Sequence, residues 1–234
     1  MNSDLFAFGF LEYVVFLLST TCHEAAHSLV ALWGGDKTAH AGGQVSLNPL
    51  PHIRREPFGM VVMPLIGIIS GTGLIGWASA PYDPVWSQKY PRRAALMSLA
   101  GPGANFSLAL LSAILMRVGL ATGYFAPAPA VFSQIVSPAT EGGIGEGVAT
   151  VLSVLFSLNI LLGIFNLIPI PPLDGYGVLG LFTTEAGALK LQQFQVKLRT
   201  FAIIGLVVAW QAIDRFYPPL FAAGARLVYL GYHA

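Results

Sequence analysis

The stretch that decides the fold of this chain reads Thr20-Thr21-Cys22-His23-Glu24-Ala25-Ala26-His27-Ser28-Leu29. On an α-helix, two histidines four residues apart lie on one face, one turn from each other, so His23 and His27 can bind a single Zn²⁺ ion. Glu24 lies about 100° farther round the helix than His23, where it can reach a water at the metal without binding the metal itself. This is the arrangement that a metal-dependent hydrolase needs.

The surroundings of the motif are apolar. Residues 5–18 carry one charge, Glu12, and an apolar run continues after the motif through residues 29–33. At about 1.5 Å per residue, a helix over 5–33 is long enough to cross a hydrocarbon core of about 30 Å. Three polar groups within five residues of such a helix cost a few kcal/mol unless they have partners, which argues against a chance pattern.

Composition points to the same class of protein. The chain has 234 residues, of which 55% are hydrophobic and 10% charged, and its mean hydropathy is +0.68. Soluble domains usually contain about 25% charged residues. The net charge of +1 and the lack of a basic stripe with interleaved aromatics exclude a nucleic-acid-binding protein. The sequence therefore predicts an integral membrane protein, and it does not indicate an oligomeric state.

We expect one all-α polytopic membrane domain over residues 1–234, with four to six transmembrane or re-entrant helices and a small membrane-associated β-hairpin. The expected elements, in order, are a helix 5–33, a loop or hairpin 36–57, a re-entrant or spanning segment 58–80, helices 94–120 and 146–168, the Pro-Pro-Leu-Asp-Gly element 171–175, a helix over about 200–216, and an interfacial tail 217–234.

Three features of the chain underlie these boundaries. Residues 44–47 alternate as a short strand would, which favours the hairpin in 36–57. The segments on both sides of 58–80 carry three basic residues each, so the positive-inside rule favours re-entry there. The loop 121–145 has no Lys or Arg and is expected outside the cytoplasm, whereas Lys190 and Lys197 mark a cytoplasmic face.

A catalytic zinc normally has three protein ligands and one open position, so one ligand is still missing. Several acidic residues fit poorly. Glu12 lies roughly 16 Å from His23 along the helix axis, which is too far to share a metal. Asp36 and Glu56 lie in the polar loop, and Asp214 is followed by Arg215, with which an ion pair is the simpler interpretation.

Asp174 fits better. It follows a segment interrupted by three prolines and precedes Gly175, so its carboxylate is presented from irregular backbone at membrane depth. Such backbone is tolerated only where it lines a cavity or is buried in protein, and an ionisable group there is a functional candidate. The alternative is that Asp174 caps a helix at the cytoplasmic interface.

The motifs of this chain resemble, in their order, those of the site-2 protease family of intramembrane zinc metalloproteases (peptidase family M50), in its short form without a PDZ or CBS domain. The elements that carry the resemblance are His23-Glu24-x-x-His27, Gly34-Gly35-Asp36, Leu47-Asn48-Pro49-Leu50-Pro51-His52-Ile53, Gly76-Trp77-Ala78, Ala100-Gly101-Pro102-x-x-Asn105 and Asn166-x-x-Pro169-x-Pro171-Pro172-Leu173-Asp174-Gly175. Two positions depart from the family's pattern, Arg54-Arg55 after His52-Ile53 and Tyr176 after Asp174-Gly175.

The resemblance implies a role for each matching residue. His23, His27 and Asp174 would bind one Zn²⁺ per chain, and Glu24 would be the general base. Asn105 would position the substrate or stabilise the oxyanion. Asn166 and the expected hairpin around 42–53 would hold an extended substrate.

The implied activity is hydrolysis of a peptide bond within or near a transmembrane segment of a membrane-protein substrate. The implied location is the cytoplasmic membrane of a prokaryote, as a multi-pass protein with the active site nearer the cytoplasmic side. Two alternatives stay open. A non-catalytic zinc-holding relative would lack Glu24 or a ligand, and none is missing here. A metal transporter would need further ligands, but the expected crossings 94–120 and 146–168 offer only Asn, Ser and Thr besides Arg117.

Overall fold

Four stretches of the computed structural model, which describes residues 3–140 and 143–230, are long and apolar enough to cross a membrane. They are α1 (Ser3–Trp33), α6 (Pro91–Ala121), α7 (Ile144–Leu167) and the run Glu185–Val228, which contains α9 (Glu185–Lys197), the 3₁₀ turn η3 (Leu198–Phe201) and α10 (Ala202–Val228). With one two-stranded sheet among the described residues, the fold class expected from the sequence, an all-α polytopic membrane protein, is confirmed.

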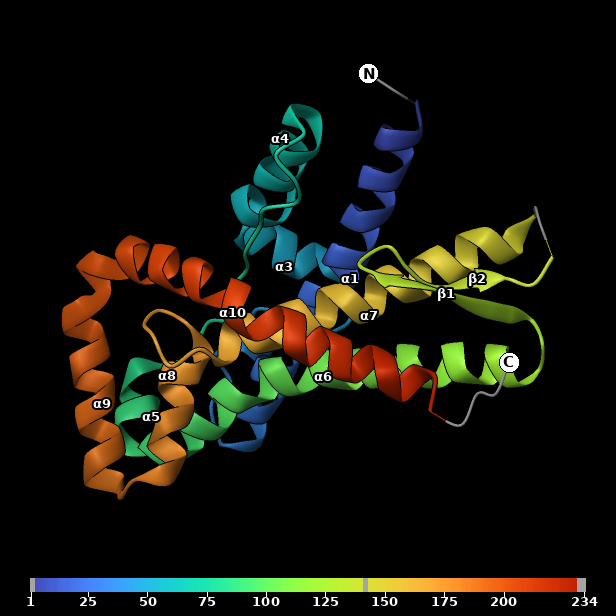
Figure 1. Ribbon diagram of the computed structural model, residues 1–234. Helices are drawn as coiled ribbons and strands as arrows, with labels where there is room; N and C mark the ends of the chain where they lie inside the picture. The colour runs from blue at the N-terminus through green and yellow to red at the C-terminus, as the bar shows by residue number, and fades with distance from the viewer. Residues whose placement is uncertain (1–2, 141–142, 231–234) are drawn as a thin grey trace.

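The main core lies where α6, α7 and α10 pack together (Figure 1). Small residues let the helices approach closely. A methyl group at Gly163 of α7 would touch the ring of Phe106 on α6, and one at Gly224 of α10 would touch the ring of Phe156 on α7. The helix α1 packs against α7 through a second cluster that includes Phe16.

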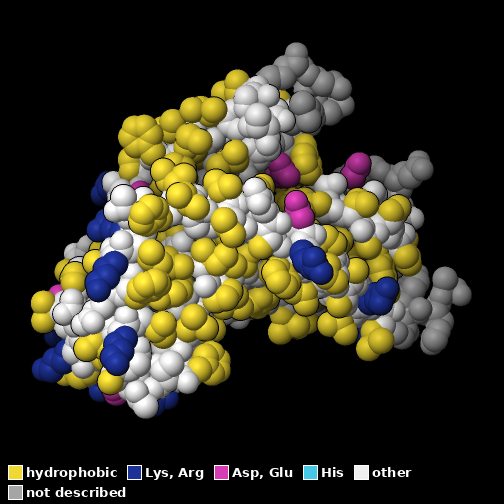
Figure 2. Space-filling model, turned by 60° about the vertical axis from the view of Figure 1, so that its left-hand side comes forward, with side chains coloured by type: hydrophobic (Ala, Val, Ile, Leu, Met, Phe, Trp, Pro, Cys, Tyr) yellow, Lys and Arg dark blue, Asp and Glu magenta, His cyan; other side chains and the backbone are white. Residues whose placement is uncertain are grey.

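The outward faces of these helices are apolar, unlike those of a soluble bundle. On α10, Ile203 is 77% exposed and Trp210 is 59% exposed, and α6 exposes Leu110 at 62%. Hydrophobic side chains cover most of the face shown in Figure 2. Burial of such a surface requires a lipid environment, so these faces are the lipid-facing sides of the membrane helices.

The expected position of the β-hairpin was wrong. Residues 36–57 contain no strand and instead form α2 (Thr38–Ala41) and α3 (Pro49–Arg55). The side chain of Asn48 accepts a hydrogen bond from Leu50 N and caps α3, and Pro49 occupies the first helical position. Proline suits a helix start and cannot donate to a strand ladder, so α3 begins at Pro49, and residues 44–47 before it contain bends rather than a strand.

The hairpin lies instead between α6 and α7 and consists of β1 (Phe125–Val131) and β2 (Gln134–Pro138), paired antiparallel. It is fastened to two helices. Ile135 N donates to Ser153 Oγ of α7 at 2.9 Å. The hydroxyl of Tyr229, the residue after α10, faces the carbonyl oxygens of Ala128, at 2.9 Å, and Ile135, and its one hydrogen can be donated to either. The alternating prolines of β1 suit a strand with an unpaired edge.

The segment 58–80 goes out and returns beside α1 (Figure 1). It begins as a π-helical turn, η1 (Phe58–Val62), continues as α4 (Met63–Ser70), and returns without helix through residues 73–83 to α5 (Pro84–Lys89). Trp77 N donates to Gly59 O at 3.1 Å, which ties the return to the outgoing part. The segment thus contains one short apolar helical stretch, Phe58–Ser70, and then turns back, a course that fits the re-entrant alternative.

The predicted end of the last helix was also wrong. α10 continues through Pro218 and Pro219 to Val228, whereas we expected a break at these prolines and an interfacial tail over 217–234. Membrane helices tolerate internal proline because neighbouring groups satisfy the freed backbone carbonyls. Residues 231–234 of the predicted tail lie outside the described residues. The remaining elements are α8 (Asp174–Val178) and the 3₁₀ turn η2 (Leu179–Phe182).

Candidate metal centre

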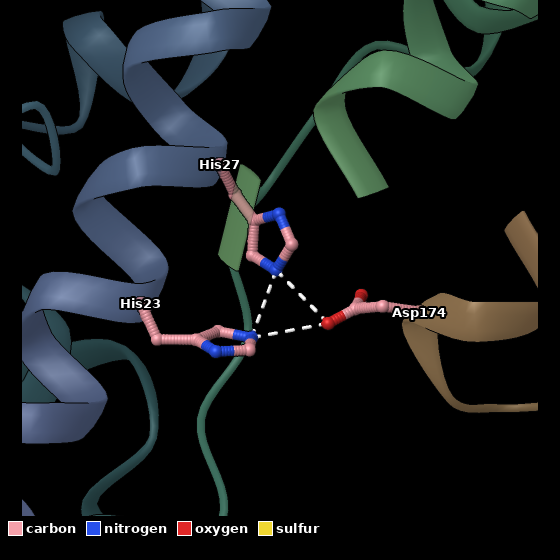
Figure 3. A group of neighbouring side chains, drawn as sticks. All are labelled: His23, His27 and Asp174. Carbon is pink, nitrogen blue, oxygen red and sulfur yellow. Dashed lines mark hydrogen bonds and ion pairs between the residues drawn. The ribbon is translucent and has the colours of Figure 1, made fainter. Parts of the chain in front are cut away.

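His23, His27 and Asp174 meet in the structure, although 151 residues separate the first from the last (Figure 3). The two Nε2 atoms of the histidines are 2.9 Å apart. Asp174 Oδ2 lies 3.1 Å from His23 Nε2 and 3.2 Å from His27 Nε2. Both histidines are buried, and Asp174 is half-buried. Among the described residues this is the one group of three or more candidate ligands that converge in this way.

The position of Asp174 follows from how the chain leaves α7. The helix ends at Leu167 because Ile168 is extended and Pro169 cannot continue it. The loop then folds back against the end of α7, and any side chain at Gly175 would strike the Leu167 carbonyl. Glycine is therefore required next to the aspartate. Asp174 is the first residue of α8 and reaches α1 from this turn.

The outer nitrogen of each imidazole is also engaged. His27 Nδ1 lies 2.7 Å from the carbonyl oxygen of Met97, and His23 Nδ1 lies 2.6 Å from Asn105 Oδ1. A carbonyl oxygen can only accept, so the Nδ1 atoms carry the hydrogens and donate. In neutral imidazoles with this tautomer, the Nε2 atoms present their lone pairs to each other and to Asp174.

This arrangement fits a zinc ion. Three electron-rich atoms within 2.9–3.2 Å repel one another unless a cation or a proton lies among them. Ligands at about 2.0–2.2 Å from a tetrahedral zinc are about 3.3–3.6 Å from each other, a few tenths of an ångström longer than these separations. Two imidazoles and one carboxylate are also the donor set of catalytic zinc sites that keep an open fourth position. His23, His27 and Asp174 would hold the ion.

The wall behind the two histidines is the backbone of α6. A Cβ atom at Gly101 would collide with the Nε2 atoms of both His23 and His27. The buried Pro102 follows and continues the helix. The Ala100-Gly101-Pro102 element therefore provides the space in which the imidazoles converge, a reason for glycine that the sequence pattern did not reveal.

Glu24 is buried at 5% exposure, and its Oε2 atom has no hydrogen-bond partner among the described residues. A buried carboxylate oxygen without a partner is costly. Its place one residue after His23 leaves that oxygen available to accept a proton from a water near the three ligands. The expectation that Glu24 stays out of the ligand set agrees with its absence from the converging group.

Asn105 contacts His23 and a second buried amide. The residue is 0% exposed and contacts Nδ1 of His23, on the opposite side of the ring from Asp174. Its Nδ2 group donates to Asn159 Oδ1 at 2.8 Å. None of these contacts supports the oxyanion role expected for Asn105, which stays a prediction, whereas they do place the amide as a support for His23.

Neither His40 nor His52 belongs to the converging ligand group. Asn166 donates to Leu162 O of its own helix at 2.9 Å. His52 is buried in α3 and its Nε2 contacts Ser46 O at 3.0 Å, and His40 is exposed in α2. Sequence reasoning missed Asn159, a buried polar residue of the apolar helix α7. Its one signal in the sequence was the free-energy cost of a polar side chain within a membrane helix.

Asp36 organises the turn that follows α1. Its carboxylate accepts hydrogen bonds from the backbone and hydroxyl of Thr38, at 2.9 and 2.6 Å, and from Asp83 N at 2.8 Å. Burial alone would raise the pKa of the Asp36 carboxyl, but these hydrogen bonds outweigh burial and hold the pKa below its usual range. Asp36 thus joins the motif helix to the return of the re-entrant segment.

The family model described as Peptidase family M50 matches residues 11–209. This chain belongs to peptidase family M50. This chain is similar to "Putative zinc metalloprotease YwhC" of Bacillus subtilis. The two are 33% identical over 167 residues, which cover 71% of this chain and 66% of that protein.

The M50 chain is also similar to "Putative zinc metalloprotease Rip2" of Mycolicibacterium smegmatis, with 33% identity over 167 residues, 70% of this chain and 53% of that protein. Rip2 of Mycobacterium tuberculosis is 32% identical over 164 residues, with 70% and 53% covered. The chain thus spans between about half and two thirds of these relatives' length. No solved structure matches it.

Proposed function

We propose that this chain is a zinc-dependent endopeptidase that hydrolyses a peptide bond within or next to a transmembrane segment of a membrane-protein substrate. The observation that carries the proposal is the convergence of His23, His27 and Asp174 near Glu24, which is buried on a membrane helix and whose Oε2 atom has no hydrogen-bond partner in the described part of the chain. Membership of family M50 and the names of the relatives, which describe zinc metalloproteases, support a zinc-dependent peptidase.

When bound at the three ligands, zinc lowers the pKa of a water and polarises a carbonyl group. Glu24 accepts a proton from the attacking water as the oxygen of that water bonds to the carbonyl carbon of the peptide. The carbon–nitrogen bond then breaks, and Glu24 passes the proton to the leaving amine. The products are a carboxylate and an amine, so no oxidant or further reactant is needed.

The segment 73–83 is the part of the chain best placed to hold an extended substrate, in place of the hairpin expected in 42–53. Its Gly76 packs on Phe16, before the motif on α1, and its Ala80 packs in the cluster of Ala31, after the motif. It therefore passes alongside the turns that carry the histidines. A non-helical segment there can pair its backbone with an unwound peptide, as in strand addition.

The charge distribution supports a centre nearer the cytoplasm. Lys and Arg gather mainly towards one side of Figure 2, with fewer towards the other. The end that holds α5, α8 and α9 lies opposite the end with the β-hairpin, whose loop 121–145 has no Lys or Arg (Figure 1). By the positive-inside rule, the α9 end faces the cytoplasm.

The test replaces Glu24 with Gln in the purified full-length chain. Glu24→Gln should keep one bound zinc and lose at least about a hundredfold in cleavage of a model transmembrane substrate in detergent, because the amide cannot accept the proton. Asp214→Asn, at an exposed position, is the matched control and should cleave normally.

Three outcomes would contradict the proposal. Unchanged cleavage by Glu24→Gln would remove Glu24 from the chemistry. A parent protein that binds zinc and a transmembrane peptide but never cleaves it would indicate the non-catalytic alternative. Uptake of zinc into proteoliposomes would favour a transporter. A transporter would need further metal ligands along its path, and the described residues contain no second group of converging ligands.

A further inference from the structure

A chain of buried hydrogen bonds runs behind the metal centre and connects three membrane helices. Ser19 lies on α1, Asn105 on α6 and Asn159 on α7, and all three are 0% exposed. Asn159 Nδ2 lies 2.8 Å from Ser19 Oγ, Asn105 Nδ2 lies 2.8 Å from Asn159 Oδ1, and Asn105 Oδ1 lies 2.6 Å from His23 Nδ1. These bonds join the three helices, which pack against one another.

The direction of each bond follows from the chemistry of its partners. Ser19 Oγ donates its hydrogen to Val15 O at 2.8 Å, so only a lone pair faces Asn159. The Asn159 nitrogen also lies 2.8 Å from Leu155 O, another pure acceptor. Both hydrogens of that nitrogen are therefore used. The Asn159 amide cannot be reversed, and its oxygen must face Asn105.

The fixed amide of Asn159 sets the orientation of the next one. Asn105 must turn its nitrogen to the oxygen of Asn159 and its own oxygen to His23. His23 then carries its hydrogen on Nδ1, and Nε2 presents a lone pair to the metal position. We propose that Asn159 is a positioning residue that fixes the tautomer of His23 through Asn105. This inference rests on the proposed zinc site.

His23 needs such a device and His27 does not. The Nδ1 atom of His27 faces the main-chain carbonyl of Met97, which cannot be turned round. An asparagine amide can rotate by 180° at little steric cost, which would put a donor opposite His23 Nδ1. His23 would then carry its hydrogen on Nε2, directed at Asp174 and His27, and zinc would have to displace that tautomer.

The experiment measures zinc affinity of the full-length protein in detergent by competition with a fluorescent chelator. Asn159→Leu has a similar volume and no hydrogen-bonding group, so Asn105 is free to rotate. We expect zinc binding to weaken about 10–100-fold, the usual cost of losing an outer partner of a histidine ligand. Ser112→Ala is the matched control, because Ser112 is equally buried and bonds only to Leu108 O of its own helix.

Two further variants separate orientation from packing. Ser19→Ala removes the tie between α1 and Asn159 but leaves Leu155 O to orient the amide, so zinc affinity should stay within about twofold of the parent. Adding Asn105→Asp to Asn159→Leu should restore zinc affinity, because both oxygens of a carboxylate accept from His23 Nδ1 whichever way it turns. A merely structural loss would not be rescued by a second buried substitution.

Three results would overturn the proposal. The first is that Asn159→Leu binds zinc as tightly as the parent. The second is that Ser19→Ala weakens zinc binding as much as Asn159→Leu does. The third is that adding Asn105→Asp to Asn159→Leu does not restore zinc binding. Circular dichroism in detergent confirms that each variant is folded, and Asn159→Ala replaces the leucine variant if that variant does not fold. The readout is the binding of zinc alone, so a failure of the proposed peptidase activity leaves it interpretable.

Discussion

Replacing Gly101 with alanine tests the geometry of the metal centre most directly. In an exposed helix interior, Gly→Ala stabilises by about 1 kcal/mol through helix propensity. At Gly101 the new methyl group collides with both histidine Nε2 atoms, whereas contacts below 3.0 Å are essentially never seen for real Cβ atoms. The sign of the effect should therefore reverse at this position.

The magnitude follows from the size of the collision. Both imidazoles would have to move by on the order of 0.5 Å or more, beyond the tolerance of about 0.2 Å in metal–ligand distances. We expect zinc affinity to fall at least about tenfold, which corresponds to about 1.4 kcal/mol. Cleavage of the model transmembrane substrate should fall in parallel.

The assay compares Gly101→Ala with Gly103→Ala, two residues farther along the same helix. A methyl group at Gly103 meets nothing within 4 Å, so this variant should bind zinc normally and be at least as stable as the parent. Zinc affinity by chelator competition and unfolding in detergent are measured for both. Equal zinc affinity of the two variants would refute the geometry described for the centre.

Two other predictions concern acidic residues. Asp174→Asn removes the anionic ligand and should weaken zinc binding by more than about a hundredfold. Losing a residue that only hydrogen-bonds to a ligand costs up to about a hundredfold, and losing the ligand itself should cost more. The control Asp214→Asn, at an exposed position, should bind zinc normally. Because the pKa of Asp36 is lowered by folding, its contribution to stability is present above the unfolded value of about 3.9 and is lost as pH falls through the folded value. Asp36→Asn should lower stability by about 1.5–3 kcal/mol at pH 7 and flatten the loss on acidification, measured by unfolding in detergent between pH 3 and 7; an unchanged slope would contradict this assignment.

The metal centre could be predicted because burying polar and ionisable side chains in an apolar membrane segment costs free energy unless they have partners. The spacing of His23 and His27 on an apolar helix indicates a metal site. Asp174 follows a proline-rich interruption of a membrane helix, and such irregular backbone is tolerated at membrane depth only where it lines a cavity or is buried in protein. The sequence also indicated the membrane helices through length and composition. These signals are local, so one chain suffices to detect them.

The elements that were missed depend on contacts between distant segments. The alternation in 44–47 indicated a strand, but the cap at Asn48 and the helix start at Pro49 determine the structure there. The true hairpin is held by Ser153 and Tyr229, which no local pattern in 125–138 reveals. Asn159 gave no motif signal, because its function as an amide partner exists only where α1, α6 and α7 meet.

The separation of the ligands along the chain has a consequence for biosynthesis. His23 and His27 enter the membrane with the first helix, but Asp174 is made 151 residues after His23. At about 5–20 residues per second, synthesis of that stretch takes roughly 8–30 s. Throughout this interval the nascent chain holds two of the three ligands, and α6 and α7 must insert before Asp174 can reach them. The centre therefore assembles only after α1, α6 and α7 have been made and Asp174 has followed them.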